Sequence, residues 1–111
     1  MKNLCLEGRI WLSLEGESFL GSGKSDLVCK IEELGSLRKA AQEMKMSYRK
    51  AWYSIKKLNE LAGEPIIILQ RGGKNGGEAI VTEKGRAVIE SFRQLQQEFD
   101  LFLAEKKNLF G

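Results

Sequence analysis

Two short amphipathic stretches in the middle of the chain constrain its fold more than any other feature. In residues 35–44 (GSLRKAAQEM), apolar residues recur at helical spacing behind Ser36, whose hydroxyl can accept a hydrogen bond from a helix-start amide. Residues 47–59 (SYRKAWYSIKKLN) repeat this arrangement behind Ser47. The apolar side of the second stretch consists of Tyr48, Ala51, Trp52, Ile55 and Leu58. Because only two residues separate the stretches, the pattern predicts two helices joined by a tight turn.

The other side of the second stretch is basic and can form hydrogen bonds. It carries Ser47, Arg49, Lys50, Tyr53, Ser54 and Lys57. Two helices of this kind form a helix-turn-helix, whose second helix can lie in the major groove of DNA. The alternative is an ordinary helical hairpin whose charges face water.

The distribution of charge favours a polyanionic partner. The net charge of the whole chain is only +3, but residues 36–74 alone carry +6, while residues 1–35 and 75–111 carry −2 and −1. A basic region concentrated on a candidate recognition element is the electrostatic footprint of nucleic-acid binding.

Composition excludes several other classes. A chain of 111 residues is the size of one domain. It has no histidine and only two cysteines, so we expect no metal site, no cofactor and no enzymatic activity. No apolar run is long enough for a membrane span, and the N-terminus does not resemble a signal peptide. We therefore expect a cytoplasmic protein with reduced cysteines.

The N-terminal third predicts a β-hairpin and a helix. Residues 9–14 (RIWLSL) alternate like a strand, and residues 18–20 can form the returning strand. Trp11 is expected to pack against a neighbouring helix rather than stack on a ligand. The helix is expected over Asp26–Leu34, with Ser25 as its cap and Gly35 as its end.

Residues 21–25 (GSGKS) resemble the end of a phosphate-binding loop. The complete motif requires a glycine at position 18, where this chain has Ser18. We therefore interpret this stretch as a flexible entry into the helix rather than a nucleotide site.

A glycine-rich segment follows the candidate recognition helix. Pro65 ends the helical region, and strands are expected at Ile66–Leu69 and Ala79–Val81. Between them lie residues 71–77 (RGGKNGG), where backbone and cations could approach a phosphate. The position of this hairpin favours a DNA-contacting wing over a loose surface loop.

A long last helix is expected from Thr82 onward. Its apolar residues Val88, Phe92, Leu95, Phe99 and Phe102 recur at steps of four and three, which is a heptad pattern. Because the preceding domain already has a full apolar set, the three phenylalanines would otherwise stay exposed. The pattern predicts an antiparallel or crossed helix pair between two subunits, although a helix packed on its own domain gives the same spacing.

Together these elements predict an α+β, mainly α fold: a winged helix-turn-helix with an N-terminal β-hairpin and a long C-terminal dimerisation helix. Residues 1–81 would form the DNA-binding part, and residues 82–111 the dimerisation helix of the same domain. The candidate DNA-binding residues are Ser36, Arg38, Ser47, Tyr48, Arg49, Lys50, Tyr53, Ser54, Lys57, Arg71, Lys74 and Asn75.

The sequence resembles a known family over roughly residues 8–105. The stretch from Gly35 to Glu60, the GGKNGGEA loop and the VTEKG helix start are similar to the N-terminal DNA-binding domain of ModE-type molybdate-responsive regulators. That domain in turn looks like the LysR-type winged helix with a dimerising linker helix. The resemblance implies that residues 47–50 open the recognition helix and that residues 72–77 form the wing.

Two functions remain open at this stage. The first is a sequence-specific, homodimeric regulator that binds double-stranded DNA, connected with molybdate or another metal oxyanion. The second is a protein-interaction module on the same scaffold, with no direct DNA target. In the resembled regulators a molybdate-binding module follows the DNA-binding domain. This sequence ends at Gly111, so we expect no molybdate to bind to this chain itself.

Overall fold

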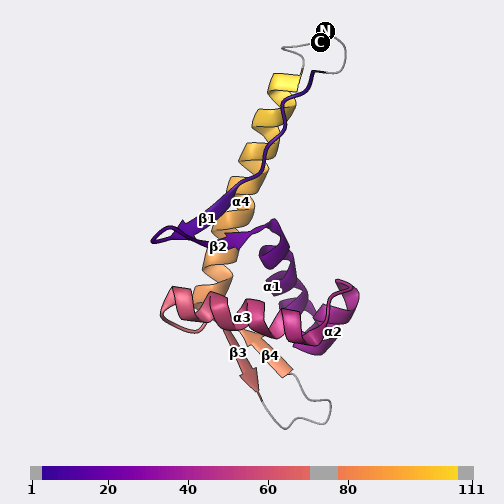
Figure 1. The fold of residues 1–111 in the computed structure, drawn as a ribbon, viewed down its shortest axis with the longest axis vertical. Helices are drawn as coiled ribbons and strands as arrows, with labels where there is room; N and C mark the ends of the chain where they lie inside the picture. Colours follow the sequence, from indigo (N-terminus) through magenta and orange to yellow (C-terminus); the bar gives the residue numbers. More distant parts are fainter. Residues whose placement is uncertain (1–3, 71–77, 108–111) are drawn as a thin grey trace.

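The computed structural model describes residues 4–70 and 78–107. The chain forms a winged helix-turn-helix from which a long helix protrudes (Figure 1). Its elements are, in order, β1 (Trp11–Leu14), β2 (Glu17–Gly21), α1 (Ser22–Leu34), α2 (Leu37–Glu43), α3 (Tyr48–Ala62), β3 (Ile67–Gln70), β4 (Glu78–Val81) and α4 (Glu83–Lys106). The expected fold class is confirmed.

The helix-turn-helix is formed by α2, α3 and a turn of a few residues. The hydroxyl oxygens of Ser36 and Ser47 accept hydrogen bonds from the amides of Lys39 and Lys50, each at 3.1 Å, so both expected caps are confirmed. In the turn, Lys45 adopts a left-handed conformation with φ 55°. This conformation reverses the chain and lets α3 begin at once.

The start of α1 differs from the expectation. The helix begins at Ser22 rather than Asp26, its N-cap is Gly21, and Ser25 is a buried residue of the first turn instead of a cap. Ser25 and Val28 are three residues apart, so they lie on the same side of α1, and both are buried. Packing of this side against the core extends the helix through serine and glycine residues, which have low helix propensity. Residues 22–25 of the GSGKS stretch are therefore the first turn of α1, and Gly21 is both the last residue of β2 and the cap of this helix.

Two β-hairpins flank the helices. Strands β1 and β2 pair antiparallel, with an irregularity after Leu12, and β3 pairs with β4 from Ile67–Val81 to Gln70–Glu78. The loop before α2 joins the second hairpin, because the amide of Ala79 donates to the carbonyl of Gly35 at 3.1 Å. The wing strands are thus attached directly to the helix-turn-helix.

The core lies between α1, α2, α3 and the first half of α4. Its largest fully buried side chains include Leu20, Leu27, Ile31, Leu37, Ile55, Leu58, Ile66 and Phe92. Three aromatic residues expected to pack inside are less covered: Tyr48 and Trp11 are exposed, and Trp52 is half-buried. Aliphatic side chains together with Phe19 and Phe92 fill the core of this small domain, and these three other rings lie at its edge.

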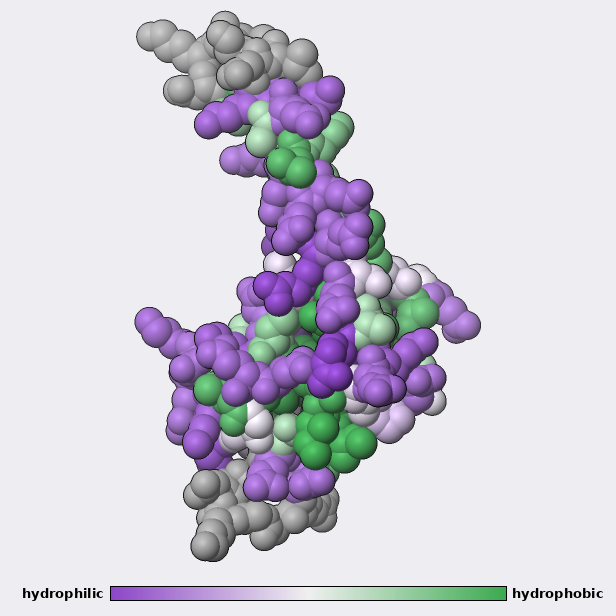
Figure 2. Space-filling view, turned by 180° about the vertical axis from the view of Figure 1, so that it is seen from behind, coloured by the Kyte–Doolittle hydropathy of each residue, from purple (hydrophilic) through white to green (hydrophobic). Residues whose placement is uncertain are grey.

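One face of the β3–β4 hairpin remains apolar and open. Ile68 and Ile80 are cross-strand partners that both lie on the surface, while their neighbours Ile67 and Val81 point into the core. Figure 2, the view from behind, shows a hydrophobic patch over this hairpin. The alternation of buried and exposed residues is that of a sheet with one face on the core.

Helix α4 extends well beyond the core, and the N-terminal segment runs beside its distal half (Figure 1). The heptad residues therefore lie in two environments. Phe92 is only 1 % exposed in the core, and Phe99 is half-buried beneath Gly8 of the N-terminal segment. Leu95 and Phe102 are exposed, and Val88 is half-buried. The expectation that all three phenylalanines would be exposed without a partner subunit is wrong, because the chain itself covers Phe92 and part of Phe99.

The start of α4 packs closely on β3. Thr82 caps the helix by accepting from the amide of Gly85, and a Cβ at Gly85 would collide with the carbonyl oxygen of Ile66.

Among residues 4–70 and 78–107, no helix is long and apolar enough to cross a membrane.

This close contact gives a prediction about stability. Gly85→Ala should lower the free energy of unfolding by about 2 kcal/mol, because backbone atoms must move apart. Gly23→Ala is the matched control. Gly23 also lies in a helix, α1, but a Cβ added there would have no neighbouring atom within 4 Å. Urea unfolding followed by circular dichroism measures both variants. Equal stability of the two would contradict the close packing of α4 on β3.

Candidate nucleic-acid interface

The exposed side of α3 carries most of the candidate DNA-binding residues. Tyr48, Arg49, Lys50, Tyr53 and Lys57 are exposed, and Ser54 is half-buried. The helix buries Ala51, Ile55 and Leu58 on its opposite side, so the polar side cannot turn inward. This arrangement confirms the division into a core side and a basic side, except that Tyr48 belongs to the exposed side.

Cations and aromatic rings are paired on this surface. The guanidinium carbon of Arg38 in α2 lies 5.0 Å from the ring centre of Tyr48, and that of Arg49 lies 5.8 Å from the ring centre of Tyr53. These contacts hold two long cationic side chains over exposed rings. The result is a positive surface shared by α2 and the first half of α3.

The structure does not place every predicted DNA-binding residue on this surface. Ser36 is 9 % exposed and its hydroxyl caps α2, so its side chain is not on this surface. Arg71, Lys74 and Asn75 lie outside the described residues. The strands on either side of their segment are β3 and β4, and β3 begins at Ile67, shortly after α3 ends at Ala62.

A single side chain attaches α3 to the wing. Oδ1 of Asn59 accepts from the amides of Ile66 and Ile67 at 2.8 and 3.1 Å, and its Nδ2 donates to the carbonyl of Ile67 at 2.9 Å. These bonds connect the last turns of α3 to the start of β3. The position of the hairpin relative to the recognition helix therefore depends on Asn59.

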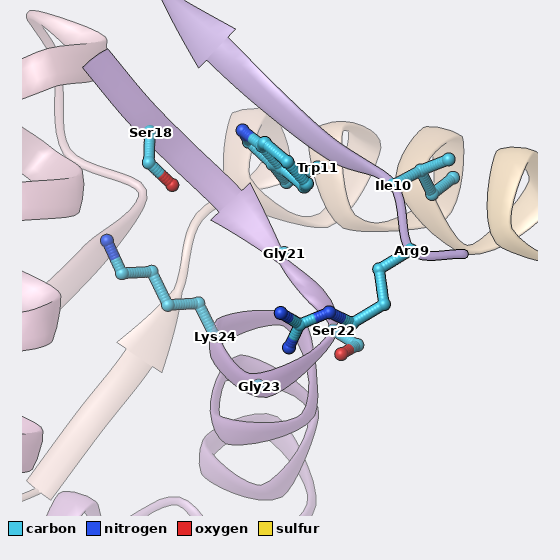
Figure 3. A pocket seen from close by; sticks show the side chains of 8 residues that line it. All are labelled: Arg9, Ile10, Trp11, Ser18, Gly21, Ser22, Gly23 and Lys24. Carbon is cyan, nitrogen blue, oxygen red and sulfur yellow. The ribbon is translucent and has the colours of Figure 1, made fainter. Parts of the chain in front are cut away.

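Positive charge continues from α3 to the start of α1. Burial lowers the pKa of Lys24, and the nearby positive charge of Lys57 lowers it further. Lys24 lines an open pocket of about 510 Å³ at the first turn of α1 (Figure 3). Trp11, the first residue of β1, and Arg9, which precedes this strand, line the same pocket. Sequence reasoning missed Lys24 as a neighbour of Lys57, because only the tertiary fold brings α1 close to α3.

The geometry agrees with a comparison against protein families. Residues 26–86 match the family described as "Bacterial regulatory helix-turn-helix protein, lysR family". The match begins in α1, includes α2, α3 and both wing strands, and ends in the first turn of α4. The chain belongs to this lysR family. Its α2 and α3 are accordingly the helix-turn-helix of a bacterial regulatory protein.

Several relatives of this chain are named for molybdenum. The molybdenum transport protein ModE of Azotobacter vinelandii is 33 % identical over 91 residues, which are 82 % of this chain and 34 % of the relative. The molybdenum-pterin-binding protein MopA of Rhodobacter capsulatus is 37 % identical over 87 residues, 77 % of this chain and 33 % of MopA. The DNA-binding transcriptional dual regulator ModE of Escherichia coli K12 is 30 % identical over 86 residues, with coverages of 78 % and 33 %.

These relatives confirm the resemblance to ModE-type regulators. The chain spans about a third of the length of the curated relatives it matches. Solved structures with the same fold include ArgP from Mycobacterium tuberculosis, with TM-score 0.56 and 20 % identity over 74 % of this chain and 29 % of ArgP. Oxidised OxyR from Corynebacterium glutamicum has TM-score 0.55 and 20 % identity over 78 % of this chain and 26 % of OxyR. At this identity the two structures show the fold alone.

Proposed function

We propose that this protein is a sequence-specific transcriptional regulator that binds double-stranded DNA as a homodimer. The observation that carries the proposal is the exposed side of α3, the second helix of a helix-turn-helix. This side presents Arg49, Lys50, Tyr53 and Lys57 to solvent. Helices in this position enter the major groove with their N-terminal residues toward the base edges. Arg49 and Lys50 are in the first turn of α3 and therefore reach the bases or the nearest phosphates.

The regulated process is proposed to involve molybdate or another metal oxyanion. Support comes from relatives whose names contain molybdenum, and from their match to the part of this chain that holds the helix-turn-helix. The proposed link to molybdate is through the genes that this protein controls.

Dimerisation is proposed to use the exposed residues of α4. Leu95 is 44 % exposed and Phe102 is 47 % exposed, on a helix that extends beyond the core of its own chain. Covering two such side chains removes apolar surface from water. A two-fold dimer also presents two copies of α3, as binding to paired half-sites requires.

Two variants separate base recognition from backbone contact. Arg49→Ala should weaken binding to the preferred duplex by roughly 1–3 kcal/mol if Arg49 contacts a base through two hydrogen bonds, with less effect on other duplexes. Lys74→Ala should weaken binding about equally on all duplexes, because a phosphate contact carries no sequence information. Fluorescence anisotropy at constant salt measures both effects.

The control for this experiment is Lys107→Ala, which removes one positive charge at the far end of α4. It should leave both affinities within about twofold of the wild type. If Arg49→Ala and Lys74→Ala also leave the affinities unchanged while their circular dichroism stays native, DNA binding through α3 and the wing is wrong. The protein-interaction function would then be the better account.

A further inference from the structure

A second group of basic residues lies outside the helix-turn-helix, at the open pocket beside the first turn of α1 (Figure 3). Arg9 and Lys24 line this pocket, and Ser18 and Ser22 add hydroxyl groups to it. None of the described residues that line it is acidic. All four of these polar side chains can donate hydrogen bonds, so the pocket suits an anionic group.

The positive charge at this pocket has no counter-charge in the described part of the chain. Among residues 4–70 and 78–107, the salt bridges belong to Lys30 and Arg86, so neither Arg9 nor Lys24 is paired with a carboxylate there. Burial lowers the pKa of Lys24, and the positive charge of Lys57 lowers it further. The two ammonium groups repel each other, and an anion bound beside them would relieve this repulsion.

Lys57 connects the pocket to one side of the recognition helix. Lys50 and Lys57 are seven residues apart, so they lie on the same side of α3, about 10 Å from each other along the helix axis. Asn59, which bonds to β3, is turned from Lys57 by roughly 200° around that axis. These lysines, with Lys24 beyond them, therefore lie on the side of α3 that faces away from the wing strands.

A helix in the major groove has a DNA backbone on each of its two sides. The groove is about 12 Å wide, which is close to the diameter of about 10–12 Å of a helix with its side chains. The wing strands are on one side of α3, so the backbone on the other side passes Lys50 and Lys57. Glu17 and Glu60 line a pocket beside Lys57 and repel phosphates, which directs the backbone toward Lys24 instead.

We propose that Lys24 and Arg9 bind phosphates of the DNA backbone on the side of α3 opposite the wing. The start of α1 and the segment before β1 then belong to the DNA interface. This inference rests on the proposed DNA-binding function and extends its contacts beyond the helix-turn-helix. A phosphate contact carries no sequence information, so these two residues strengthen binding to every duplex. Their continuity with Lys57 of α3 favours a phosphate of DNA over a free phosphate ion.

The salt dependence of DNA binding tests this contact in the full chain. Each phosphate contact contributes about −0.9 to the slope of log affinity against log salt concentration. On a duplex of mixed sequence, Lys24→Gln and Arg9→Gln should each make this slope less steep by about 0.9 for each bound subunit. Lys24→Arg keeps the positive charge and should keep the slope. Lys107→Gln is the control, because it removes one positive charge at the far end of α4 and should leave the slope unchanged.

Three results would overturn the contact. The first is a wild-type slope in both Lys24→Gln and Arg9→Gln while their circular dichroism stays native. The second is an equal loss of slope in Lys24→Arg, since the side chain would then support the local structure instead of binding a phosphate. The third is saturable binding of inorganic phosphate to the amides of residues 22–24 in an NMR titration at constant ionic strength, together with unchanged slopes. The pocket would then hold a free anion.

Arg49→Ala, measured on the preferred duplex in the same series, separates this inference from the proposed function. Weaker binding of Arg49→Ala together with unchanged slopes of Lys24→Gln and Arg9→Gln would overturn only the additional phosphate contacts. A wild-type protein that binds no duplex would overturn DNA binding itself. The expected result is weaker binding of Arg49→Ala on the preferred duplex and less steep slopes of Lys24→Gln and Arg9→Gln.

Discussion

Asn59→Ala should lower the free energy of unfolding by about 3 kcal/mol. This is the largest loss of stability that we expect from replacing any single side chain outside the buried core. The Asn59 side chain bonds to two backbone amides and one carbonyl at the start of β3. Its removal leaves these three groups without their partner in a partly buried place, and each such loss costs about 1 kcal/mol or more. Urea unfolding followed by circular dichroism measures the change.

Asn59→Asp is the matched control for this prediction. Its carboxylate can still accept from the amides of Ile66 and Ile67, but it cannot donate to the carbonyl of Ile67. It should therefore lose less stability than Asn59→Ala. If Asn59→Ala unfolds within about 0.5 kcal/mol of the wild type, water replaces these bonds and Asn59 does not hold the wing.

The second large effect concerns assembly. Leu95→Glu/Phe102→Glu should raise the dimer dissociation constant by more than about 100-fold, because the interface would have to bury unpaired carboxylates. The variant should stay helical, since both residues are exposed in the single chain. Sedimentation should show a monomer. Its affinity for a duplex with two half-sites should fall, while its affinity for a single half-site should stay close to that of one wild-type subunit.

Leu101→Glu is the control for this variant. Leu101 is 63 % exposed, but it lies on another side of α4, next to Arg93, Gln94 and Gln97. A charge there should leave the dimer intact. A Leu95→Glu/Phe102→Glu protein that still sediments as a dimer would show that subunits meet through a different surface.

The local features of this fold were predictable from short stretches of sequence. Ser36 and Ser47 are confirmed as helix caps, since a capping hydroxyl and the amide it binds are three residues apart. The last helix was expected to begin at Thr82, and in the structure Thr82 is the cap of a helix that begins at Glu83. The two helices of the helix-turn-helix followed from apolar spacing and a short turn. The charged side of α3 followed from the same spacing, because burying one side of a helix exposes the other.

Features that depend on tertiary packing were not predictable in this way. A heptad pattern places Phe92 and Leu95 on adjoining positions, but only the fold shows that Phe92 enters the core and Leu95 does not. Similarly, serine is a typical capping residue, but Ser25 is instead a buried residue in the first turn of α1. Lys24 of α1 lies near Lys57 of α3, and Phe19 of β2 lines an apolar groove together with Val88 of α4. Both arrangements join segments that are distant in the sequence.

Selection of duplexes from a random pool by the wild-type protein tests the central claim most directly. The claim is that α3 recognises specific DNA sequences. Sequencing of the selected pool should reveal an inverted pair of half-sites, bound about 10³-fold more tightly than a scrambled duplex. The affinity should fall steeply with salt, with a slope of about −0.9 per phosphate contacted. A pool without enrichment, or an affinity that is equal on all duplexes, would contradict the claim.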